Sequence, residues 1–190
     1  MGRPAKFTRD RILDAAGALA AEGGAASITI ASIAARLEGP VGSVYHRFAS
    51  RDLLLAALWL RTVERFQEGL LTALAADDLE QAALHTPRWC RENPIDATLL
   101  VLHRPEDLVP RWPDELASAR AEVNTRLIDA LRAFLERNRG IDDTSVLFAV
   151  VDVPYGAVRR HLLGRETLPA RLDELIITTC RAVTGTQQTG

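Results

Sequence analysis

TIASIAARLEGPVGSVYHRFASRDLLL, residues 29–55, is the stretch that decides how this chain folds. Apolar residues recur every three or four positions from Ile30 to Leu37, which predicts a short helix with Thr29 as its N-cap. Glu38-Gly39-Pro40 ends that helix, and a second short helix follows at 40–48. Two short helices joined by a turn that contains glycine have the layout of a helix-turn-helix.

Helical periodicity continues on both sides of this stretch, and no segment alternates apolar and polar residues as a strand does. Upstream, Thr8 and Gly23-Gly24 mark the ends of one helix, and downstream Ser50 caps a long helix. Five more helices are predicted at 78–93, 95–103, 113–139, 143–163 and 168–184. We therefore expect an all-α protein of nine helices, with a kink or break at Pro154 inside the eighth.

The helix at 40–48 has a narrow tip, because positions 41–43 are valine, glycine and serine. Val44 and Phe48 lie four residues apart and can anchor the opposite side in a core. In a helix-turn-helix, the second helix places its N-terminal residues in the major groove of DNA. We therefore interpret residues 40–48 as a DNA-recognition helix.

Residues 29–55, with RILDAAGALAAEGG upstream, resemble the DNA-binding signature of the TetR family of bacterial transcriptional regulators. The core of that signature, G-[ST]-x-Y-x-x-F, is met here by Gly42, Ser43, Tyr45 and Phe48. The resemblance implies two domains, a DNA-binding helix-turn-helix domain at 1–52 and a ligand-binding and dimerisation domain at 53–190.

The resemblance also implies which residues contact DNA. Base edges would be reached by Val41, Gly42 and Ser43, and phosphates by Thr29, Tyr45, His46 and Arg51. The turn departs from the family, since Glu38-Gly39-Pro40 replaces the usual Gly-Val-Ser, and its geometry is left open. Only Ser43 at the tip has a hydrogen-bonding side chain, so DNA deformability and a basic arm would have to add specificity.

Positive charge gathers toward the N-terminus. Residues 1–56 carry seven Arg or Lys against five Asp or Glu, and the remainder carries sixteen against twenty. Lys6 is one of four cations among the first eleven residues. An arm of this charge could lie along DNA phosphates, or it could be a solvated terminus.

The C-terminal part resembles the family only in its layout. The resemblance implies a homodimer through the eighth and ninth helices, 143–163 and 168–184, although their apolar stripes could equally be the core of one subunit. It also implies a cavity for a small-molecule effector, with six candidate residues: Trp59, Thr62, Phe66, Trp89, Arg120 and Asn124. The tryptophans could instead be plain core, Arg120 could reach past the apolar surface to solvent, and Asn124 could bond to a neighbouring helix.

Other functional classes have little support in the sequence. It contains no HExxH, GxSxG, phosphate loop or GxGxxG, so we expect neither an enzyme nor a cofactor. His85, His103 and His161 lack metal-ligand spacing, so we expect no metal. Cys90 and Cys180 are predicted to be free thiols.

We also expect a cytoplasmic protein that does not enter the membrane. The N-terminal residues are charged, and the longest apolar run, 53–60, is too short to cross a bilayer. The sequence as a whole predicts a ligand-responsive repressor that binds palindromic, double-stranded operator DNA as a dimer. The alternative is a small-molecule-binding protein on the same fold with weak or lost DNA binding, which the altered turn suggests.

Overall fold

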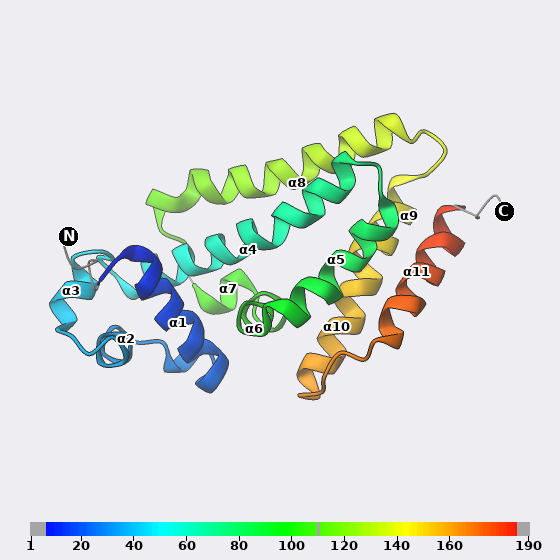
Figure 1. Ribbon diagram of the computed structural model, residues 1–190. Coiled ribbons are helices and arrows are strands. Elements are labelled where there is room, and N and C mark those ends of the chain that lie inside the picture. Colours follow the sequence, from blue (N-terminus) through cyan, green and yellow to red (C-terminus); the bar gives the residue numbers. More distant parts are fainter. Residues whose placement is uncertain (1–6, 110, 186–190) are drawn as a thin grey trace, which may run out of the picture.

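The computed structural model describes residues 7–109 and 111–185, and this part of the chain is helical with no strand (Figure 1). The all-α prediction is confirmed. Lys6 lies outside the described residues. The first four helices are α1 (Arg9–Gly23), α2 (Ile30–Arg36), α3 (Val41–Tyr45) and α4 (Arg51–Ala75). They are followed by α5 (Leu79–Glu92), α6 (Pro94–Leu102), α7 (Pro105–Leu108), α8 (Ala117–Arg137), α9 (Asp143–Leu147), α10 (Val153–Leu163) and α11 (Arg171–Thr184).

The predicted N-caps are confirmed. The Thr8 side chain accepts a hydrogen bond from a backbone N–H three residues on at 3.2 Å, and that of Ser50 does the same at 3.1 Å. Thr29 and Ser32 form a capping box, in which each side chain accepts from the backbone N–H of the other, at 3.0 and 2.9 Å. These bonds satisfy N–H groups that have no partner inside their helices, and they fix where α1, α2 and α4 begin.

The structure differs from the nine predicted helices at two places. A short helix, α7, forms between the predicted helices at 95–103 and 113–139, where none was predicted. The predicted helix at 143–163 is divided into α9, a π-helical turn at Phe148–Asp152, and α10. Pro154 has no N–H to donate to the preceding turn, and the π-helical turn just before it accommodates the interrupted hydrogen-bond ladder.

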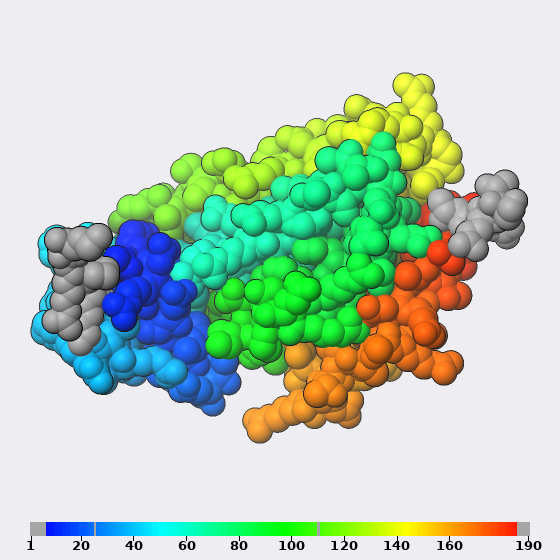
Figure 2. All heavy atoms as spheres, viewed as in Figure 1, coloured from blue at the N-terminus to red at the C-terminus, as the bar shows by residue number. Residues whose placement is uncertain are grey.

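Buried side chains form two clusters that share α4. The first cluster joins α1, α2 and α3 to the first half of α4 and includes Ile12, Val44, Phe48 and Leu58. The second joins the last turns of α4 to α5, α10 and α11 and includes Leu74, Leu84, Val158 and Ile176. α1–α3 accordingly lie at one end of the molecule and α10 and α11 at the other, with α8 alongside α4 (Figures 1 and 2).

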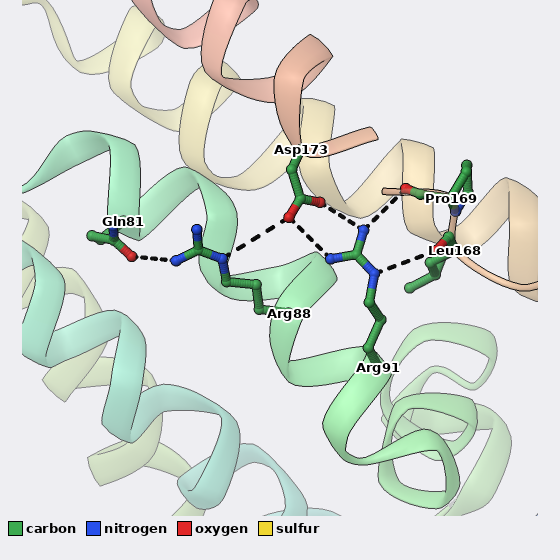
Figure 3. Close-up of polar contacts among 6 residues, drawn as sticks. All are labelled: Gln81, Arg88, Arg91, Leu168, Pro169 and Asp173. Atoms are coloured by element: carbon green, nitrogen blue, oxygen red, sulfur yellow. Dashed lines mark hydrogen bonds and ion pairs between the residues drawn. The ribbon is translucent and has the colours of Figure 1, made fainter. Parts of the chain in front are cut away.

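Ion pairs connect α11 to α5 near both ends of α11. Near its first turn, Arg91 donates two hydrogen bonds to Asp173, at 2.6 and 3.0 Å, and Arg88 approaches the same carboxylate at 4.0 Å (Figure 3). Near its last turn, Arg181 donates to both oxygens of Glu80, at 2.7 and 3.0 Å. Bidentate pairs of this kind fix orientation as well as position, so α11 has one defined inner face and one defined outer face.

The two cysteines are free, as predicted, and the structure shows that both are buried. Burial raises the pKa of Cys90 to about 12, which leaves it a thiol at neutral pH. Among the described helices, none is both long enough and apolar enough to span a bilayer.

Candidate nucleic-acid interface and apolar cavity

α3 is held by one face and presents the other to solvent. Val44 and Phe48 are fully buried, and the Arg9 guanidinium lies 4.4 Å from the centre of the Phe48 ring. On the outer face, Val41 is 42% exposed and Tyr45 is 52% exposed. α3 therefore has one face anchored in the core and one face open to solvent.

Gly42 lies at the tip of this helix, and a Cβ placed on it would meet no heavy atom within 4 Å. Packing within the chain therefore does not require glycine at this position, and neither does its backbone conformation, which is helical. The missing side chain leaves open space in front of the first turn of α3. A second molecule could approach the backbone closely there.

The turn between α2 and α3 has a definite geometry, which the sequence had left open. Glu38 adopts a left-handed conformation with φ of 50°, which costs a non-glycine residue about 1–2 kcal/mol. The next residue must be glycine for a different reason, because a Cβ on Gly39 would overlap the ring of Phe7. Pro40 then serves as the N-cap of α3 without a capping side chain.

The four predicted phosphate contacts occupy three places around this turn. Tyr45 and His46 are exposed at the end of α3. Thr29 is exposed at the start of α2, and its hydroxyl is engaged in the capping box. Arg51 is half-buried at the start of α4, and its Nε donates to the carbonyl of Ile28 at 2.6 Å. Arg51 therefore ties α4 to the residue just before Thr29, which brings two of the predicted phosphate contacts close together.

Sequence reasoning missed the contacts that hold the segment before α1 against α3. Arg47 donates from Nε to the carbonyl of Phe7 at 3.2 Å, and Arg9 donates to the carbonyl of Arg47 at 3.4 Å. Phe7 also lies against Gly39. Periodicity could not predict these contacts, because Phe7 precedes the first helix and belongs to no repeating pattern.

A separate cavity of about 280 Å³ lies between α4, α6, α8 and the π-helical turn. Three of the six predicted effector residues line it: Trp59, Phe66 and Asn124. Sequence reasoning missed three polar residues of its lining: Gln67, Thr86 and Tyr155. Gln67 had a visible signal, since it interrupts the apolar stripe of α4 one turn after Val63.

The other three predicted effector residues lie outside this lining. Thr62 is fully buried in α4, and its hydroxyl has no hydrogen-bond partner among the described residues. Trp89 packs edge-on against Phe66, with ring centres 5.2 Å apart, and faces a more polar hollow between α4 and α5. Arg120 pairs with Glu106 at 2.8 Å and lies over the ring of Trp112, so its charge is engaged outside the cavity.

The part of the chain that the structure describes contains no group of three or more His, Cys, Asp or Glu side chains placed to hold a metal ion. His85 is half-buried beside Phe66, and this burial lowers the pKa of its imidazole. The imidazole is therefore neutral over most of the physiological range.

Comparison with known proteins agrees with this geometry. The sequence pattern of the bacterial regulatory proteins of the tetR family matches residues 12–58, which contain α2, α3 and the start of α4. The chain is 30% identical over 152 residues to the HTH-type transcriptional repressor KstR of Rhodococcus jostii, covering 78% of this chain and 69% of KstR.

Solved structures share the whole fold. The transcriptional regulator FadR of Bacillus subtilis, solved with stearoyl-CoA, superposes with a TM-score of 0.71 at 16% identity, over 95% of this chain and 100% of FadR. SmeT, the repressor of a multidrug efflux pump of Stenotrophomonas maltophilia, superposes with a TM-score of 0.68 at 20% identity, over 93% and 90% of the two chains. With its helix-turn-helix, its overall fold and its likeness to KstR, the chain belongs to the TetR family of bacterial regulatory proteins.

Proposed function

We propose that this protein is a one-component repressor that binds a palindromic operator as a homodimer and leaves it when a small molecule fills the cavity. Residues 1–52 form the DNA-binding head, and residues 53–190 form the ligand-binding and dimerisation part, with no catalytic activity. The observation that carries this proposal is the tip of α3. Val41 and Tyr45 are exposed there, Gly42 has empty space in front of it, and Val44 and Phe48 hold the other face rigidly.

On DNA, the tip of α3 enters the major groove. Val41, Gly42 and Ser43 reach base edges, while Thr29, Tyr45 and His46 contact phosphates on either side. Arg51 contributes mainly by holding the start of α4 to Ile28. Direct reading of bases is sparse with these side chains, so the operator is recognised partly by its shape.

The dimer uses the outer faces of α9, α10 and α11. The apolar residues of these helices fall into two groups. Val150, Leu172 and Ile176 are buried within the subunit, whereas five large side chains are exposed: Leu147, Phe148, Tyr155, Leu163 and Leu175. Because Arg91 and Glu80 fix the orientation of α11, Leu175 is held outward where a second copy can cover it.

The cavity can act on the DNA-binding head through two helices that line it and also contact α1. In α4, Arg61 pairs with Asp14 of α1 at 2.8 Å. In α6, Ile95 packs over Gly17 of α1, and the Cγ2 atom of Ile95 lies 3.6 Å from the position that a Cβ on Gly17 would occupy. A ligand that displaces α4 and α6 therefore tilts the head. The ligand must bind the DNA-free form more tightly to have this effect.

Gly42→Ala tests the placement of α3. We expect the melting temperature to stay the same or rise slightly. Alanine is more favourable than glycine inside a helix by about 0.5–1 kcal/mol, and its methyl group has open space here. We expect DNA affinity to fall about tenfold or more, because the new methyl group stands between the helix and the groove. Fluorescence anisotropy on DNA flanking the gene measures the affinity.

Gly140→Ala is the matched control, since it also faces open space but lies far along the chain from α3. Unchanged affinity in Gly42→Ala would mean that the tip of α3 does not meet DNA. Absence of any DNA binding by the wild-type protein would favour the alternative function, a small-molecule-binding protein that has lost DNA binding.

A further inference from the structure

The cavity between α4 and α8 has uncharged walls. Its lining contains no Asp, Glu, Lys, Arg or His among the described residues. Trp59 and Phe66 supply aromatic surface, and seven aliphatic residues supply most of the remaining wall: Val63, Leu70, Leu100, Val101, Leu127, Val150 and Val151. Such a lining favours an apolar ligand and opposes any ligand that carries a charge.

One fully buried polar atom in this lining lacks a partner in the described part of the chain. Gln67 is only 4% exposed, and no group in the described part of the chain donates a hydrogen bond to its Oε1. A buried amide oxygen left in this state costs about 1–3 kcal/mol relative to one that is satisfied. Its position on the cavity wall means that a bound molecule can supply the missing hydrogen bond.

The other polar groups near the cavity are placed differently. The Tyr155 hydroxyl donates to the carbonyl of Val101 at 3.1 Å, so its proton is already engaged. Asn124 is exposed to solvent and lies toward the open side of the cavity. Thr86 is a buried hydroxyl residue of the same lining, but Gln67 is the lining residue with a fully buried polar atom that lacks a partner in the described part of the chain. Gln67 therefore fixes the position of a polar group at the buried side.

We propose that the cavity binds a small, uncharged alcohol whose hydrocarbon part lies against Trp59 and Phe66 and whose hydroxyl bonds to Gln67. This inference rests on the proposed function, because it names the chemical class of the effector. A glutamine amide offers an acceptor and donors, and a hydroxyl can both donate and accept. The alcohol therefore satisfies Gln67 whichever way its amide is turned.

Size and charge argue against the other classes of ligand. The volume of about 280 Å³ is slightly below the ~300–1,000 Å³ typical of drug-sized ligands, so the cavity is too small to enclose a molecule as large as an acyl-CoA completely. A carboxylate or an ammonium ion would lose its hydration without gaining an opposite charge. Arg120, one of the candidate effector residues, is occupied by Glu106 and Trp112.

Four probes of equal chain length test this chemistry on the full-length protein: octanol, octyl methyl ether, octanoate and octyltrimethylammonium. Isothermal titration calorimetry at neutral pH measures their affinities. We expect octanol to bind at least about tenfold more tightly than either charged probe and about fivefold more tightly than the ether, which has an oxygen but no proton to donate. Tighter binding of octanoate, of the ammonium ion or of the ether, or failure of octanol to bind, would overturn the proposal.

Gln67→Leu tests the contact itself. We expect this variant to melt at a higher temperature in the absence of ligand, because it removes a buried unpaired amide, and to bind octanol and the ether equally. Gln81→Leu is the matched control, since Gln81 is exposed and outside this cavity, and it should keep the preference for octanol. An undiminished preference in Gln67→Leu would overturn the proposal, and if the variant fails to fold, the wild-type ranking of the four probes decides.

Release of DNA is measured separately, by anisotropy with and without octanol. Octanol binding that depends on Gln67 but does not release DNA would support the cavity chemistry and count against the regulatory role. Release of DNA by octanoate in preference to octanol would support the regulatory role and count against the cavity chemistry.

Discussion

Leu175→Asp is expected to yield a folded monomer, whereas Ile176→Asp, one residue further along α11, is expected to unfold the protein. Leu175 is 54% exposed on the outer face of the helix, and Ile176 is 1% exposed within the subunit core. In the proposed dimer, aspartate at 175 places an unpaired carboxylate from each subunit in the interface, which should raise the dimer dissociation constant about a hundredfold or more.

Aspartate at 176 has a different cost. It removes a buried isoleucine and inserts a charge among the side chains that join α11 to α5, Leu172 and Cys180 among them. Losses of about 4–5 kcal/mol or more arise from this mechanism, which is comparable to the whole stability of many domains. Sedimentation analysis and thermal melts distinguish the two results. A Leu175→Asp variant that associates as strongly as the wild type at micromolar concentration would place the dimer interface elsewhere.

Phe48→Ala should destabilise the DNA-binding head by about 3–5 kcal/mol, because Phe48 is fully buried and its removal leaves a cavity under α3. The Arg9 guanidinium also loses the ring on which it lies. We expect DNA binding to disappear while the dimer persists, since α11 belongs to the second core cluster.

Thermal denaturation monitored by circular dichroism measures the loss of stability in Phe48→Ala, and gel filtration shows whether the dimer persists. Phe48→Leu is the control, and it should recover most of the stability because it keeps the position apolar. Wild-type stability in Phe48→Ala would mean that α3 is not held by this anchor, and the rigid tip that we propose would lose its support.

Local features of this fold could be predicted from the sequence. The caps at Thr8, Thr29 and Ser50 and the stop at Gly24 each depend on residues within one turn, and each is present. The anchoring of α3 by Val44 could be predicted because Val44 and Phe48 lie four residues apart. These signals are short-range, and they were sufficient to identify the helix-turn-helix.

Features that depend on contacts between distant segments could not be predicted. Periodicity shows which face of a helix is apolar but not what covers it, so it could not separate Leu175 from Ile176. For the same reason it grouped Arg120 with Asn124, although only Asn124 reaches the cavity. The turn at Glu38 was recognised as unusual, but the need for Gly39 arises from Phe7, which lies more than thirty positions away.

The central claim is that α3 docks on DNA, and the affinities of the wild type and of Tyr45→Ala for DNA flanking the gene, at about 150 mM salt, test it most directly. Tyr45 is 52% exposed, so its removal should change the free energy of unfolding by no more than about 0.5 kcal/mol. As a phosphate contact it carries no sequence information, so we predict about a tenfold loss on every DNA sequence that the wild type binds. Wild-type affinity in Tyr45→Ala would contradict this docking of α3.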